Sequence, residues 1–160
     1  MNNLKKENLH HIYGSFLVLI SIILAALEYN KLFILPVNLE FKQRYLDFSI
    51  LLYISIWIIY VLILMAGILT LFKSRKASLL LLIIGFSSLL EVYANETIYF
   101  VKSIDDTTKY ILLFTFLTSI LGVGLNYLQS EKTNVVEVVL SITLAIMIVY
   151  LPNALISFYF

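Results

Sequence analysis

A glutamate inside a long apolar segment is the residue of this sequence best placed to do chemistry. Glu91 lies 13 residues after Ser78, where that segment begins, which is about 20 Å along a helix. A charged residue at such a depth in a membrane is costly and often marks an ion or proton site. Three hydrogen-bonding residues lie three or four positions from Glu91 and share its face of a helix: Ser87, Ser88 and Asn95.

A second acidic residue extends the same pattern. Gly14, Ser21 and Glu28 are spaced by seven residues, so they share one face of a helix. When the first and third apolar segments run in the same direction, Glu28 and Glu91 reach a similar depth in the outer half of a membrane. A threonine of the fourth segment is expected at that depth too. The sequence therefore predicts an intramembrane polar site made of Glu91, Glu28, Asn95, Ser88 and Thr115.

Each of these residues also has a structural interpretation. Stripes of serine, threonine, glycine and asparagine commonly hold helices together in lipid. Glu28 can instead end its helix at the membrane surface, three residues before Lys31. Glu91 can instead make a structural hydrogen bond to another helix. Glu96 and Glu137 are expected near the interface, and an acid such as Glu137 in the first turn of a helix suits the helix dipole.

The remaining sequence offers no catalytic or cofactor motif. His10 and His11 precede the first apolar segment and there is no cysteine, so haem, thiolate and intramembrane histidine–metal sites are not expected. Neither H-E-x-x-H nor G-x-S-x-G occurs. A net charge of +1 argues against nucleic acid as a partner. We therefore expect no cofactor and no metal, and a non-enzymatic protein ahead of a lipid-handling enzyme.

Five apolar segments must position these residues. Hydrophobic residues make up 61% of the 160-residue chain and the mean hydropathy is +0.97, which is too apolar for a water-soluble domain. The sequence predicts an all-α integral membrane protein, a single membrane domain over residues 1–160, in which about five transmembrane helices with short loops form a bundle. The expected spans are 12–34, 48–72, 78–101, 110–128 and 134–156.

The ends of these segments carry further signals. The first segment follows Lys5 and Lys6 as in a signal peptide, but no A-x-A cleavage site comes after it, so it is expected to remain as a span. Aromatic residues near segment ends, such as Tyr13, are typical of interfacial anchors. Pro152 is expected to kink the last helix or to turn residues 153–160 along the membrane surface.

Basic residues in the short loops predict the orientation. Six lie on the side of the N-terminus and five on the opposite side, so the count alone decides little. Lys73, Arg75 and Lys76 form a compact group without an acid, however, whereas the opposite loops mix both signs. We expect the N-terminus in the cytoplasm and the C-terminus outside. A composition rich in isoleucine, asparagine, lysine, tyrosine and phenylalanine is typical of AT-rich coding genomes, and the expected location is a bacterial plasma membrane.

Small loops, few intramembrane charges and the lack of a motif favour a non-enzymatic partner of another membrane protein: a subunit, an assembly factor, or a regulatory or immunity-type protein. The alternative is a small cation- or proton-coupled transporter or channel that uses Glu91 and Glu28 as an outer site. The expected partners are the lipid bilayer and either another membrane protein or a second copy of the chain, in a homo-oligomer. An outward-facing stripe of small or apolar residues favours the first function, and flux that depends on Glu91 favours the second.

Overall fold

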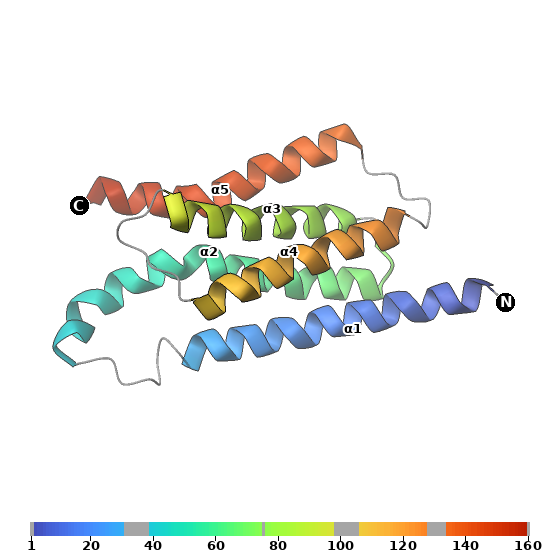
Figure 1. Ribbon diagram of the computed structural model, residues 1–160, viewed down its shortest axis with the longest axis horizontal. Coiled ribbons are helices and arrows are strands. Elements are labelled where there is room, and N and C mark those ends of the chain that lie inside the picture. Colours follow the sequence, from blue (N-terminus) through green and yellow to red (C-terminus); the bar gives the residue numbers. More distant parts are fainter. Residues whose placement is uncertain (1, 31–38, 75, 98–105, 128–133, 160) are drawn as a thin grey trace.

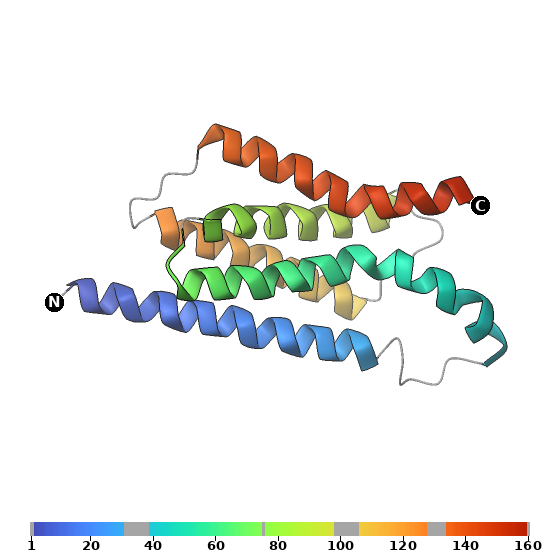
Figure 2. The same ribbon diagram turned by 180° about the vertical axis from the view of Figure 1, so that it is seen from behind.

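The chain forms a bundle of α-helices that run up and down along a common direction (Figures 1 and 2). The computed structural model describes residues 2–30, 39–74, 76–97, 106–127 and 134–159. Within these ranges the helices are α1 (Asn2–Tyr29), α2 (Leu39–Leu71), α3 (Lys76–Thr97), α4 (Asp106–Tyr127) and α5 (Val135–Tyr159). α1, α3 and α5 run one way and α2 and α4 the other, so the two termini lie at opposite ends (Figure 1).

Each of the five helices contains a stretch that is long and apolar enough, by length and composition, to cross a membrane. These stretches are Asn8–Tyr29, Ile54–Leu71, Lys76–Tyr93, Asp106–Asn126 and Val135–Pro152. The prediction of an all-helical chain with five such helices is therefore confirmed.

Two helices begin well before the apolar segments that predicted them. α1 begins at Asn2 rather than at residue 12, and α2 begins at Leu39 rather than at residue 48. An apolar run marks the part of a helix that avoids water, whereas the backbone hydrogen bonds of the helix continue into the polar residues before that run. The predicted span ends at residues 34, 101 and 128 lie outside the described residues.

α5 continues through Pro152 as far as Tyr159. Pro152 has no N–H to donate to the carbonyl of Ile148, four residues earlier, and the ribbon of α5 changes direction toward its C-terminal end (Figures 1 and 2). A bend is the expected consequence of a proline inside a helix. The kink predicted from the sequence agrees with this bend, but the residues after Pro152 stay helical.

α2 ends in a Schellman motif that leads directly into α3. Lys73 has a left-handed backbone, with φ of 53°, and its N–H donates to the Thr70 carbonyl at 3.0 Å. The Ser74 N–H donates to the Leu69 carbonyl at 2.9 Å. The Ser74 carbonyl then accepts from the Ala77 N–H at 3.0 Å, at the start of α3. This tight turn makes α2 and α3 antiparallel neighbours.

α2 and α3 form the centre of the bundle, because each packs against three other helices: α3 against α2, α4 and α5, and α2 against α1, α3 and α5. Figure 1 shows α4 crossing in front of α2, and Figure 2 shows it behind. The best-buried apolar side chains come largely from α2 and α3: Ile56, Ile59, Ile63, Leu81 and Ile84. Most of the polar residues singled out in the sequence therefore lie on or beside the two helices that form the core.

Two glycines bring α1 and α2 into close contact. A Cβ atom added to Gly67 would lie 2.9 Å from the Val18 nitrogen, and one added to Gly14 would lie 3.0 Å from the Gly67 carbonyl oxygen. Apolar helices approach this closely where small residues meet. About two helical turns after Gly14, on the same helix, the Ser21 hydroxyl donates to the Tyr60 carbonyl at 2.8 Å. The α1 face that carries Gly14 and Ser21 therefore packs on α2.

Candidate functional site

Glu91 lies on the inner side of α3 and is 1% exposed. Ser87 and Ser88, which share its helix face, are fully buried as well. Because α3 is surrounded by α2, α4 and α5, these three side chains lie inside the bundle. The expectation that they face inward is met, and a ligand-binding role for them stays a prediction.

Three buried serine hydroxyls in this region have no hydrogen-bond partner in the part of the chain that the structure describes: Ser55, Ser87 and Ser88. Other helical hydroxyls of the chain behave differently, since they donate to the backbone carbonyl four residues earlier: Thr70 at 2.7 Å, Thr115 at 2.9 Å, Ser141 at 2.7 Å and Thr143 at 3.0 Å. A buried hydroxyl without a partner carries a desolvation cost of about 1–3 kcal/mol. These three hydroxyls are therefore candidates for holding a polar ligand.

Ser55 and Glu91 lie at about the same level of the bundle. Ser55 comes 17 residues before Phe72 and Glu91 comes 15 residues after Lys76, on opposite arms of the α2–α3 turn. At the helical rise these distances are about 25 Å and about 22 Å from the turn. We call Ser55, Ser87, Ser88 and Glu91 the polar cluster.

Ser55 was not among the residues singled out in the sequence. Its signal is the helical spacing of a stripe whose members are all buried: Ser55, Ile59, Ile63, Ala66 and Thr70. This stripe follows the spacing of four or three residues that defines one face of a helix. A serine that begins such an inward-facing stripe is a candidate for a buried polar site.

Glu28 is 3% exposed near the end of α1, so its side chain is buried. It continues the face on which Ser21 contacts Tyr60 of α2. Ser21 lies beside Tyr60 of the antiparallel α2, so Glu28, seven residues later, is at the level of about residue 53 of α2. This level is about one helical turn further from the α2–α3 turn than that of Glu91. In both views α2 lies between α1 and α3 (Figures 1 and 2), so the two glutamates come from helices on different sides of α2.

The remaining predicted site residues have local roles or lie outside the description. Thr115 is 3% exposed, and its hydroxyl donates to the Ile111 carbonyl within α4 at 2.9 Å. Asn95 belongs to the last turn of α3, and its side chain is outside the described ones. At the start of α5, Glu137 accepts a hydrogen bond from the Asn134 N–H at 3.0 Å, which is a helix-capping contact.

Two contacts of α4 are structural. The Asn126 Nδ2 donates to the Ser78 hydroxyl of α3 at 2.9 Å, and both residues are buried. The Tyr13 hydroxyl of α1 donates to the Thr118 carbonyl at 2.7 Å. Tyr13 is half-buried against α4, where Gly122 leaves space for its ring. Its expected place at a membrane interface stays a prediction.

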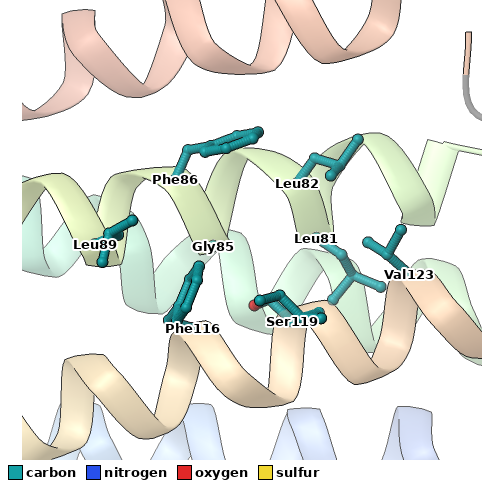
Figure 3. A pocket seen from close by; sticks show the side chains of 9 residues that line it. Leu81, Leu82, Gly85, Phe86, Leu89, Phe116, Ser119 and Val123 are labelled. Carbon is teal, nitrogen blue, oxygen red and sulfur yellow. The ribbon is translucent and has the colours of Figure 1, made fainter. Parts of the chain in front are cut away.

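An apolar groove between α3 and α4 is the second feature that can hold a ligand or partner. Its volume is about 310 Å³. Figure 3 shows Gly85 of α3 between the side chains of its own helix and those of Phe116 and Ser119 on α4. Its lining residues are Leu81, Leu82, Gly85, Phe86, Leu89, Phe116, Ser119, Ile120 and Val123. Because no charged residue lines it, the groove suits an apolar occupant.

Among the described residues, no group of three or more histidine, cysteine, aspartate or glutamate side chains is placed to hold a metal ion. No protein-family model matches the chain, and no curated protein and no solved structure matches it either. The arrangement of the polar cluster and of the groove is therefore the basis for assigning a function.

Proposed function

We propose that this chain is an integral membrane protein that acts as a non-enzymatic partner of another membrane protein, as a subunit, an assembly factor, or a regulatory or immunity-type protein. The observation that carries this proposal is the apolar groove between α3 and α4. A groove with glycine in it and apolar side chains around it is the kind of surface that a helix of a partner covers in lipid.

The groove continues into an exposed apolar rim. Leu89 on α3 is 42% exposed, and Ile120 and Leu117 on α4 are 52% and 58% exposed. A Cβ at Gly85 would lie 3.4 Å from the Ser119 Cβ and 3.8 Å from Phe116 Cδ2, so a side chain at this position would extend from α3 toward α4 in the groove. We propose that the occupant is a large apolar side chain from a transmembrane helix of the partner.

The test is to extract the tagged protein in a mild detergent and determine the mass and composition of the complex. We expect a stoichiometric second membrane protein with the wild type, and an at least tenfold loss of it with Gly85→Leu, because the new side chain fills the groove. Gly124→Leu is the matched control: Gly124 is exposed on α4 with nothing within 4 Å of its Cβ position. Equal recovery with both variants, a homo-oligomer, or bound lipid without a second protein would contradict this proposal.

The proposed location is a bacterial plasma membrane with the N-terminus in the cytoplasm. The α2–α3 turn lies at the same end of the bundle as the N-terminus (Figure 1), and both Lys73 and Lys76 in this turn are exposed, which supports a cytoplasmic end rich in positive charge. We expect a reporter that is active only in the cytoplasm to work when fused to the N-terminus and to be silent when fused to the C-terminus. The reverse pattern would refute this orientation.

A second candidate function is cation- or proton-coupled transport through the outer half of the bundle, with Glu91 and Glu28 as the acidic residues. The burial of both carboxyl groups inside apolar helices favours it. In liposomes, Glu91→Gln is expected to abolish cation or proton flux while the protein stays folded, and Glu137→Gln, which alters a capping residue, is expected to leave flux unchanged. Normal flux in Glu91→Gln would exclude this function.

A further inference from the structure

We propose that the polar cluster of Ser55, Ser87, Ser88 and Glu91 binds one small monovalent cation inside the bundle, with Na⁺ as the ion to test. This inference deepens the transport candidate by naming its ion and the residues that hold it. It concerns binding alone, so it can stand when transport fails.

The serines supply ligand atoms that nothing else in the described part of the chain uses. Ser55, Ser87 and Ser88 are all 0% exposed, and their hydroxyl oxygens have no hydrogen-bond partner there. Helical serines in lipid normally satisfy themselves by donating to the carbonyl four residues earlier, as Ser141 of this chain does at 2.7 Å. A hydroxyl that does not make this bond is not held toward a carbonyl of its own helix, so its oxygen can turn toward an ion.

The position of the serines relative to Glu91 fits one shared site. Ser87 and Ser88 are four and three residues before Glu91, the spacing that brings side chains together on a helix. Ser55 reaches the same level from α2, which packs against α3. Hydroxyl and carboxylate oxygens are the ligands that hard cations prefer.

The charge of the cluster favours one positive charge. Glu91 is the only acid among its members, and a divalent ion would leave an uncompensated charge in an apolar interior, which is strongly unfavourable. Glu28, on α1, is separated from α3 by α2 (Figure 1).

The burial of the cluster keeps solvent from competing for the ion, since its serines are 0% and Glu91 is 1% exposed. α5 packs against α2 and α3 and contributes Ala145 and Val149, both 0% exposed. Ile56 and Ile84 are also buried to 0% and 1%. In such an environment an ion gives up its water shell, and the protein oxygens replace it.

The test titrates the purified protein in detergent with NaCl against choline chloride at constant ionic strength and follows the unfolding midpoint. A ligand that binds the folded state raises the midpoint with a saturable dependence on its concentration. Glu91→Gln is expected to weaken the apparent Na⁺ affinity about 100-fold or more, because the compensating charge is lost. Ser88→Ala removes one ligand oxygen and is expected to weaken the affinity about tenfold.

Ser141→Ala is the matched control. Ser141 is as buried as the cluster serines, but its hydroxyl donates to the Glu137 carbonyl of its own helix, so the Na⁺ response is expected to stay as in the wild type. The proposal is overturned when choline raises the midpoint as much as Na⁺ does, or when Ser88→Ala and Ser141→Ala respond alike. Comparison of Ser88→Ala with Ser141→Ala tests Na⁺ binding even when Glu91→Gln does not fold. Na⁺ binding without flux in liposomes would keep this site and exclude transport.

Discussion

Gly67→Val is expected to separate α1 from α2 and to lower the free energy of unfolding by about 3 kcal/mol. A Cβ at Gly67 would lie 2.9 Å from the Val18 nitrogen and 3.0 Å from the Gly14 carbonyl oxygen. Both are backbone atoms, so the clash cannot be relieved by rotating a side chain. The whole of α1 must move, and this loses the Ser21–Tyr60 hydrogen bond in the same interface.

The measurement is unfolding of the purified protein in mixed micelles, followed by circular dichroism as the denaturing detergent is increased. Gly124→Val is the matched control, because the same β-branched side chain enters another apolar helix at a position with nothing within 4 Å of the new Cβ. We expect the control to lie within about 0.5 kcal/mol of the wild type. Equal stability of the two variants would show that α1 and α2 do not pack through these glycines.

Helices and their count could be predicted from the sequence because a long apolar run in an apolar chain leaves the backbone little alternative to a helix. Their first residues could not, since α1 and α2 extend into polar flanks that an apolar pattern does not mark. The α2–α3 turn was also hard to foresee in detail. The left-handed position at its centre is occupied by Lys73, whereas glycine is the residue that normally identifies such a position.

Part of the candidate site could be predicted in the same way. The inward orientation of Glu91 and Ser88 follows from their spacing on a single helix, and both are buried. The level of Ser55 relative to these two residues depends on the register between two helices, which the tight α2–α3 turn sets and which no local pattern encodes. Thr115 is buried, but a helical position does not fix a side-chain rotamer, and its hydroxyl bonds within α4.

Gly122→Ala is expected to destabilise the wild-type protein by about 2 kcal/mol and to be nearly neutral when Tyr13 is also replaced by alanine. A Cβ at Gly122 would overlap the Tyr13 ring, coming within 2.7 Å of Cε1 and even closer to Cζ and the hydroxyl. The ring cannot retreat without giving up the 2.7 Å hydrogen bond from its hydroxyl to the Thr118 carbonyl. The penalty of Gly122→Ala therefore comes from Tyr13 and disappears with it.

The double-mutant cycle is measured by the same unfolding assay, with Gly124→Ala as the control that should be neutral with and without Tyr13. Additive effects of Gly122→Ala and Tyr13→Ala would show that these residues do not touch.

A second ring contact joins the same helices, since Phe16 of α1 and Phe114 of α4 meet edge to face with centroids 6.4 Å apart. Because α4 forms one wall of the groove beside Gly85 (Figure 3), a shift of α4 away from Tyr13 is also expected to reduce partner recovery. Gly122→Ala thus tests whether the α1–α4 contact holds the proposed docking surface in shape.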